Sequence, residues 1–257
     1  MQFPVYIKLF GLSIHPHFLF ESLGYSIGFL MFRLLKHKSG DVVSQSVRWS
    51  VIAAATLGAA IGSKLFYWLE DPQRIIANWN NFQVVWGGKT IIGGLIGGLI
   101  AVEWTKKKLN VRERTGDLFV IPLCIGTAIG RIGCFLTGLE DDTYGQATSL
   151  PWGVDFGDGI KRHPTQIYEI LFLLVLGAMS YFAVRRKHRQ GDIFKGFMVG
   201  YSAWRLIIDF LKTDPHYWGM NTLQWACLAV LIYYSPDIKR WITHKAQGKA
   251  TLAAEES

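Results

Sequence analysis

Seven apolar segments of roughly membrane-spanning length make up about half of this 257-residue sequence. A helix of about 17–25 apolar residues crosses the roughly 30 Å hydrocarbon core of a bilayer. The segments lie at about 18–35, 49–69, 91–104, 118–136, 166–184, 193–211 and 221–235. The third segment is short and needs its flanks to span. The pattern predicts an all-α integral membrane protein with seven transmembrane helices, forming a single transmembrane domain over residues 1–257.

The distribution of charge predicts how the chain is oriented. The formal net charge of +8 could indicate a nucleic-acid partner, but the basic residues concentrate in alternate connections, which indicates a membrane protein instead. The connections rich in basic residues, together with the C-terminal tail, contain Lys36, Lys38, Arg48, Lys106, Lys107, Lys108, Arg112, Arg114, Arg185, Arg186, Lys187, Arg189, Lys239, Arg240, Lys245 and Lys249. Because basic residues favour the inside, we expect a periplasmic N-terminus, a cytoplasmic C-terminus, and periplasmic loops at about 70–90 and 137–164. The second of these loops lies between helices 4 and 5.

Small residues recur at four-residue spacing in several segments. The pairs are Gly24/Gly28, Gly58/Gly62, Gly93/Gly97, Gly94/Gly98, Gly126/Gly130 and Gly196/Gly200. Glycine lets helix backbones approach each other in a membrane, so the spacing predicts close helix packing. The three cysteines, by contrast, show neither metal-ligand spacing nor a disulfide framework. No metal and no organic cofactor is expected from the sequence.

Arg131 and Arg205 lie inside apolar stretches. A cation at the centre of a membrane helix costs about 2.5–3.5 kcal/mol on insertion scales, so such residues usually face a polar cavity. The guanidinium fork matches a phosphate with two charge-assisted hydrogen bonds. The two arginines therefore predict a buried site for an anionic lipid headgroup.

Tyr201, Arg205 and Asp209 follow one another at intervals of four, so they share one helix face. Two interpretations are open. Arg205 and Asp209 can form an internal pair that neutralises both charges, or the three residues can form a polar stripe along a cavity.

The segment HPTQIYE at 163–169 begins another apolar stretch. Helix N-termini favour anions, which makes His163, Gln166 and Glu169 candidate headgroup contacts; an ordinary helix cap is the alternative. Glu169 and Glu21 can also simply neutralise buried cations. Cys134, three residues after Arg131, could be a nucleophile, but a free cysteine is more often a small buried hydrophobe.

Several motifs resemble the signatures of the bacterial prolipoprotein diacylglyceryl transferase family. They are GRIGCFLTG at 130–138, YGQATSLPWGVDF at 144–156, RHPTQIYE at 162–169, YSAWRLIIDF at 201–210 with the downstream Gln224, and GGLIGG at 93–98. The resemblance implies transfer of a diacylglyceryl group from phosphatidylglycerol to the lipobox cysteine of a prolipoprotein signal peptide, with release of glycerol phosphate. It also implies a multi-pass protein of the bacterial cytoplasmic (inner) membrane.

By position, the resemblance implies that Arg131 and Arg205 are the essential arginines around the phosphate. Tyr201 matches the family tyrosine, Gly145 the glycine of the outer loop, and His163 the histidine before the proline.

The chain departs from the family at several positions. Ile92 stands where the family has histidine, Cys134 where it has asparagine, Asp209 where it has glutamate, and Glu21 where it has tyrosine. The inserted LEDDT makes the family acid match Glu140, Asp141 or Asp142.

Because Ile92 cannot accept a proton, we expect Glu21, His163 or Asp209 to serve as proton acceptor. Lys64 and Lys89 are expected to add positive potential at the headgroup, beside Gly145, Gln166 and Glu169. Two alternatives remain: a related transferase of lipid or phosphoglycerol groups with another acceptor, or a non-catalytic phospholipid-binding or transport protein.

Overall fold

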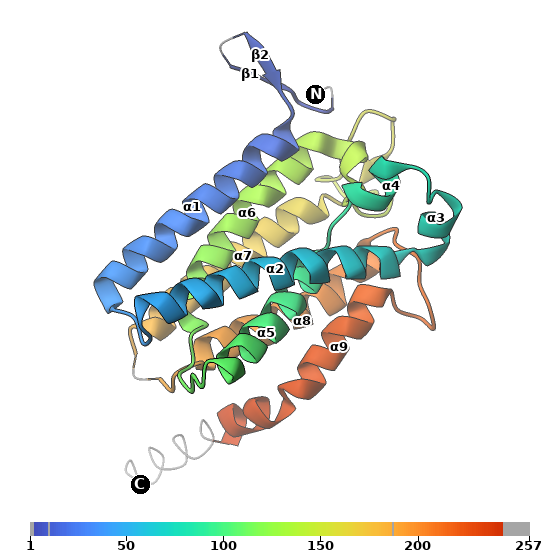
Figure 1. The fold of residues 1–257 in the computed structure, drawn as a ribbon. Coiled ribbons are helices and arrows are strands. Elements are labelled where there is room, and N and C mark those ends of the chain that lie inside the picture. The colour runs from blue at the N-terminus through green and yellow to red at the C-terminus, as the bar shows by residue number, and fades with distance from the viewer. Residues whose placement is uncertain (1–2, 10, 187, 244–257) are drawn as a thin grey trace, which may run out of the picture.

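The computed structural model describes residues 3–9, 11–186 and 188–243, which fold mainly into helices (Figure 1). The long helices are α1 (Pro16–Ser39), α2 (Gln45–Glu70), α5 (Ile91–Lys108), α6 (Val120–Thr137), α7 (Thr165–Val184), α8 (Asp192–Ile208) and α9 (Thr222–Tyr233). The short elements are strands β1 (Ile7–Leu9), β2 (Leu12–Ile14), β3 (Val154–Asp155) and β4 (Lys161–Arg162), helices α3 (Pro72–Ala77) and α4 (Phe82–Gly87), and 3-10 turns η1 (Asp117–Phe119), η2 (Gly138–Asp141) and η3 (Asp209–Leu211). Each predicted apolar segment thus contains one long helix.

Four helical stretches are long and apolar enough to cross a membrane, judged by length and composition. They are Pro16–Ser39, Gln45–Glu70, Asp117–Asp141 and Thr165–Val184. The other three predicted segments are helical but less suited to spanning alone. Helix α5 ends in three lysines, α8 has 17 residues, and α9 has 12. The chain is therefore a helical membrane protein, with the antiparallel pairs β1–β2 and β3–β4 outside its candidate spans.

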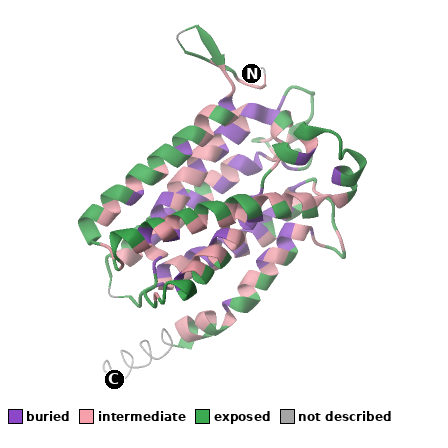
Figure 2. Ribbon diagram, viewed as in Figure 1, coloured by how far each residue is buried: buried purple, intermediate pink, exposed green. Residues whose placement is uncertain are grey.

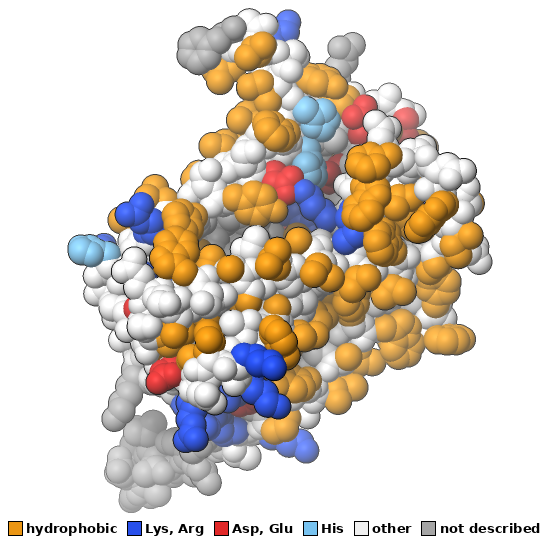
Figure 3. Space-filling view, viewed as in Figure 1, with side chains coloured by type: hydrophobic (Ala, Val, Ile, Leu, Met, Phe, Trp, Pro, Cys, Tyr) orange, Lys and Arg blue, Asp and Glu red, His pale blue; other side chains and the backbone are white. Residues whose placement is uncertain are grey.

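The helices form two closely packed pairs, in which α1 lies along α6 and α2 lies along α5 (Figure 1). Helix α7 packs on α6, and α8 packs on α9. The β1–β2 hairpin, helices α3 and α4, and the loop after α6 gather at one end of the bundle, opposite the C-terminal end of the described chain. Lysine and arginine side chains cluster at that C-terminal end on the face seen in Figure 3.

The α2–α5 pair depends on glycine. A Cβ at Gly62 would lie 2.3 Å from the carbonyl oxygen of Gly93, and one at Gly97 would lie 2.2 Å from that of Gly58. No side chain fits at these distances, so the backbones touch directly. Close packing at this glycine spacing is confirmed here.

The α1–α6 pair uses the same device. A Cβ at Gly24 would lie 2.6 Å from the carbonyl oxygen of Gly126, and one at Gly133 would lie 3.2 Å from the Cα of His17. Gly196, in contrast, has no atom within 4 Å of its would-be Cβ, whereas a Cβ at Gly200 would lie 3.3 Å from Cδ1 of Leu176 on α7. The approach at Gly133 brings the start of α1 against α6, where several polar residues lie.

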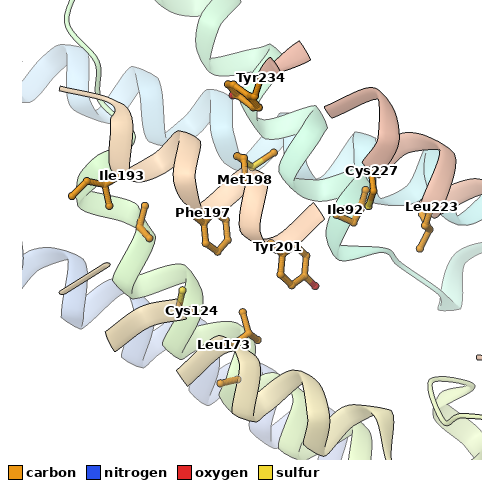
Figure 4. Packing of buried hydrophobic residues seen from close by; sticks show 12 residues of the cluster. Ile92, Cys124, Leu173, Ile193, Phe197, Met198, Tyr201, Leu223, Cys227 and Tyr234 are labelled. Atoms are coloured by element: carbon orange, nitrogen blue, oxygen red, sulfur yellow. The ribbon is translucent and has the colours of Figure 1, made fainter. Parts of the chain in front are cut away.

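The apolar core lies between α5, α6, α7, α8 and α9 (Figure 4). Phe197 and Tyr201 stack with ring centroids 5.9 Å apart, and Ile92, Leu173 and Cys227 are each 1% exposed or less. The outer faces of the helices carry exposed residues (Figure 2). Many of these are large and apolar, as Figure 3 shows, which suits contact with lipid.

We predict that Gly62→Ala destabilises the protein by at least about 2 kcal/mol, because the added methyl group forces α2 and α5 apart. Gly94→Ala is the matched control, since the nearest atom to its Cβ would be 3.6 Å away. It should leave stability unchanged or slightly raised. Thermal unfolding of the purified variants in detergent micelles tests this, and equal losses for both variants would contradict it.

Candidate functional site

Two buried arginines, each beside a carboxylate, form the centre of the candidate site. We call this set the arginine cluster. Its members are Arg131 on α6, Glu169 on α7, Tyr201 and Arg205 on α8, and Asp209 and Lys212 at and after η3. Every member is less than a tenth exposed.

Arg131 pairs with Glu169 across the α6–α7 interface, with 2.8 Å between Nη2 and Oε2. The Tyr201 hydroxyl donates a hydrogen bond to the other oxygen of Glu169. Glu169 thus joins α7 to both α6 and α8. Its position one turn into α7 explains the geometry, because the preceding Pro164 and Thr165 start the helix.

Arg205 holds Asp209 with two parallel hydrogen bonds, Nε to Oδ1 at 2.9 Å and Nη2 to Oδ2 at 2.8 Å. Lys212 lies 3.4 Å from the same carboxylate. The internal Arg–Asp pair is therefore the interpretation that the structure favours for these two residues. As both oxygens of Asp209 are engaged by cations, this carboxylate is poorly placed to accept a substrate proton.

Both arginines therefore already have a carboxylate partner, and neither guanidinium group is left without a counter-charge. Each is already neutralised, which lowers the cost of burying it in lipid. The cluster nevertheless contains three cations and two carboxylates. Asp214 lies near Lys212 and Asp209, and burial raises the pKa of its carboxyl despite the opposing effect of Lys212.

One donor of the cluster has no partner within the described part of the chain. The Nε of Arg131 is buried and makes no hydrogen bond there. An unpaired buried donor is costly, and a ligand oxygen can satisfy it. The surplus positive charge and this free donor both suit an anion.

A second polar group lies next to the arginine cluster, and we call it the histidine cluster. It contains His17 and Glu21 of α1, Cys134 of α6, Asp141 of η2, and Lys89 before α5. On the face seen in Figure 3, acidic, basic and histidine side chains gather between apolar surfaces toward the end that bears the β1–β2 hairpin.

His17 is the centre of this second cluster. Its Nδ1 lies 2.6 Å from Asp141, and its Nε2 lies 3.5 Å from Glu21. Glu21 also forms an ion pair with Lys89 and accepts a 2.9 Å hydrogen bond from Tyr25. Glu21 and Lys89 were both predicted as site residues, and the structure brings them together.

Cys134 connects the two clusters. Its sulfur lies 3.8 Å from Nη1 of Arg131, and within 4.8 Å of the ligand atoms of His17 and Asp141. Arg131 and Cys134 occupy adjacent turns of α6, so one helix supplies a residue to each cluster.

His163 does not join either cluster. Its ring lies 3.3 Å from the Tyr168 hydroxyl, and its backbone pairs with Gly145 and Gln146 in the outer loop. Gly145 fits tightly against it, since a Cβ there would lie 2.7 Å from that of His163. Gln166 donates to Thr143 at 3.3 Å, while its buried Oε1 has no partner in the described residues.

Lys64 is also held by backbone groups. Its Nζ donates to the carbonyl oxygens of Trp86 at 2.7 Å and Gly88 at 2.5 Å. It therefore fastens the end of α4 to α2, and two of its three donors are used. Ile92 belongs to the apolar core, together with Cys227 and Tyr201 (Figure 4).

Sequence reasoning missed His17, although its spacing from Glu21 is one helical turn. That signal is weak, because a partner for His17 is visible only once η2 folds back toward α1. Asp141 was one of three acids that could not be told apart, and the structure separates them. Asp141 contacts His17, Glu140 lies 3.7 Å from His15, and Asp142 pairs with Arg74.

Comparison with known proteins identifies one matching family and several relatives that align with most of the chain. The family described as prolipoprotein diacylglyceryl transferase matches residues 4–235. A phosphatidylglycerol–prolipoprotein diacylglyceryl transferase of Clostridium tetani is 32% identical over 219 residues, covering 82% of this chain and 86% of the relative. Proteins of the same name from Bordetella bronchiseptica and Nitrosomonas europaea are each 30% identical, covering 84% and 89% of this chain and 85% and 86% of the relatives.

We predict that Glu169→Ala destabilises the fold by about 3–5 kcal/mol, because it leaves Arg131 buried without a counter-charge. Adding Arg131→Met should recover much of the loss, since no uncompensated charge then remains. Glu140→Ala, at an exposed acid, is the control and should change stability by less than about 0.5 kcal/mol. Thermal unfolding in detergent measures all three; a double variant less stable than Glu169→Ala would refute the pairing argument.

Proposed function

The chain belongs to the prolipoprotein diacylglyceryl transferase family, and we propose that its arginine cluster binds the phosphate of phosphatidylglycerol during the transfer reaction. The protein is a transferase that moves a diacylglyceryl group from phosphatidylglycerol to a prolipoprotein, as the names of its relatives state. The acceptor is the lipobox cysteine of the signal peptide. Its sulfur forms a thioether with the glyceryl carbon, and glycerol phosphate leaves.

The surplus cation of the arginine cluster is the observation that carries this proposal. The arginine cluster has three cations and two carboxylates, which leaves one positive charge. A phosphodiester has one negative charge, which balances it. The free Nε of Arg131 supplies a hydrogen bond to a phosphate oxygen. Glu169 and Asp209 hold the two guanidinium groups in place before the lipid arrives, so little reorganisation is needed in the reaction.

The same cations stabilise the leaving group. As the carbon–oxygen bond breaks, negative charge grows on the departing phosphate, and fixed positive groups in a site of low dielectric interact strongly with it. Tyr201 takes part through Glu169, which it orients by its hydrogen bond. Lys89, almost half exposed, is suited to meet the headgroup on its way in.

We further propose that seven helices span the cytoplasmic (inner) membrane of a bacterium, with the N-terminus in the periplasm. The basic residues at the end of the bundle that holds the C-terminal segment support this orientation. The β1–β2 hairpin and the loop after α6 then face the periplasm.

Arg131→Ala and Arg205→Ala should each lower transfer at least about 100-fold, because each removes a donor that stabilises the leaving phosphate. The assay uses purified full-length protein, vesicles of phosphatidylglycerol and a lipobox peptide, with mass spectrometry of the product peptide. Arg74→Ala, at an exposed surface pair, should retain activity. Arg131→Lys, which keeps the charge, controls for misfolding.

Full turnover by both alanine variants would disprove the phosphate role. Two other results distinguish the alternative functions. Modification of a different acceptor by the wild type would indicate a related transferase. Movement of fluorescent phosphatidylglycerol between leaflets without any peptide would indicate a transporter.

For the orientation, a fluorescent protein fused after Ser257 should be fluorescent, and alkaline phosphatase fused there should be inactive, because that end lies in the cytoplasm. Alkaline phosphatase inserted after Asp158, in the exposed outer loop, should be active. The reverse pattern would overturn the proposed topology.

A further inference from the structure

Three side chains of the histidine cluster bring a nitrogen, a sulfur and an oxygen atom around one point. A ring nitrogen of His17, the sulfur of Cys134 and a carboxylate oxygen of Asp141 all lie within 4.8 Å of one another. Imidazole, thiolate and carboxylate are the ligands of Zn²⁺ in proteins, and three protein ligands with one open position are typical of catalytic zinc. We propose that these three residues bind a zinc ion, whose fourth position takes the acceptor thiol.

The distances are within reach of a tetrahedral site. Zinc bonds of about 2.0–2.3 Å place neighbouring ligand atoms about 3.3–3.7 Å apart. Nδ1 of His17 and Oδ1 of Asp141 are 2.6 Å apart as a hydrogen-bonded pair. Zinc would replace the proton between them, so these two atoms would separate by about 1 Å.

Each proposed ligand already has a partner that orients it. Nε2 of His17 lies 3.5 Å from Glu21, the second oxygen of Asp141 accepts a 2.5 Å hydrogen bond from Thr143, and the sulfur of Cys134 lies 3.8 Å from Nη1 of Arg131. Metal-bound histidines usually donate their other ring N–H to a carboxylate, and bound carboxylates are themselves hydrogen-bonded. The partners Glu21, Thr143 and Arg131 thus form a second layer of polar contacts around the three proposed ligands.

The backbone also favours the site. Gly133 allows the first turn of α1 to lie against α6, and the would-be Cβ of Gly133 is only 3.1 Å from the carbonyl oxygen of Pro16. Three ligands therefore come from α1, α6 and η2, and all three elements pack together. Cys124 and Cys227 differ, since both belong to the apolar core.

The role of the metal rests on the proposed function. A free thiol has a pKa of about 8.5 and is mostly protonated at neutral pH, whereas a zinc-bound thiol is deprotonated. The bound thiolate attacks the glyceryl carbon, the C–S bond forms, and the C–O bond to phosphate breaks. Glycerol phosphate leaves with the electron pair, and the thiol proton passes to solvent by way of the partly exposed Glu21.

The contact between the two clusters would place the zinc-bound thiolate next to the phosphate that leaves. Arg131 contacts Cys134 and belongs to the arginine cluster. One turn of α6 therefore sets the activated sulfur beside the phosphate that must leave. Zinc also supplies the thiol activation that Ile92 cannot provide.

Metal analysis of the purified full-length protein, grown with added zinc, tests the site directly. We expect about one zinc per chain in the wild type, as one three-ligand site binds one ion. His17→Ala and Cys134→Ala should each lose at least about nine-tenths of it, whereas the matched controls His163→Ala and Cys227→Ala should keep it. Protein loaded with cobalt should show a thiolate-to-cobalt charge-transfer band in the wild type and in both matched controls, and Cys134→Ala should lack it.

A wild type without stoichiometric zinc, or a cobalt band that persists in Cys134→Ala, would overturn the site. The transfer assay separates the two proposals. Arg205→Ala should lose transfer yet keep zinc. Zinc binding without any transfer by the wild type rejects the proposed function alone. Full transfer by chelator-treated, metal-free protein rejects the thiol-activating role alone.

Discussion

Charge neutralisation inside a lipid-facing bundle is the constraint on which this structure depends. A guanidinium group cannot remain alone in hydrocarbon, so Arg131 and Arg205 need partners as the helices pack. Glu169 provides one partner from the neighbouring α7, and Asp209 provides the other from the end of the same helix. The positions of α6, α7 and α8 are therefore coupled through ion pairs. The same groups are available to a phosphate, because the set retains a surplus positive charge.

Such pairs are weak evidence for stability, since apolar side chains of similar size often serve as well or better. The α2–α5 pair illustrates this, because backbone contact between glycines holds it without any charge. The bundle thus combines direct backbone contact between α2 and α5 with a charged face whose burial stability alone does not explain. Function is the better reason for keeping three buried cations on that face.

Local patterns could predict much of this, and tertiary contacts account for the rest. The apolar segments gave the long helices, and the glycine spacing gave the close pairs. The Arg205–Asp209 pair follows from one-turn spacing on a helix. The partner of Arg131 could not be predicted, because Glu21 and Glu169 were both acids in apolar segments and only packing decides between them.

The contact between His17, Cys134 and Asp141 shows most clearly what could not be predicted from the sequence. In the sequence, His17 is more than a hundred residues from the other two, and LEDDT looks like an insertion in a loop. In the structure, the insertion folds as η2 and directs Asp141 toward α1. Gly133 allows α1 to approach α6 closely enough for this contact. A glycine that the sequence associates only with helix packing therefore also helps to position His17 beside Cys134. In the proposed zinc site, thiol activation would come from the interface of α1 and α6, whereas the resemblance places a histidine at the position of Ile92, at the start of α5.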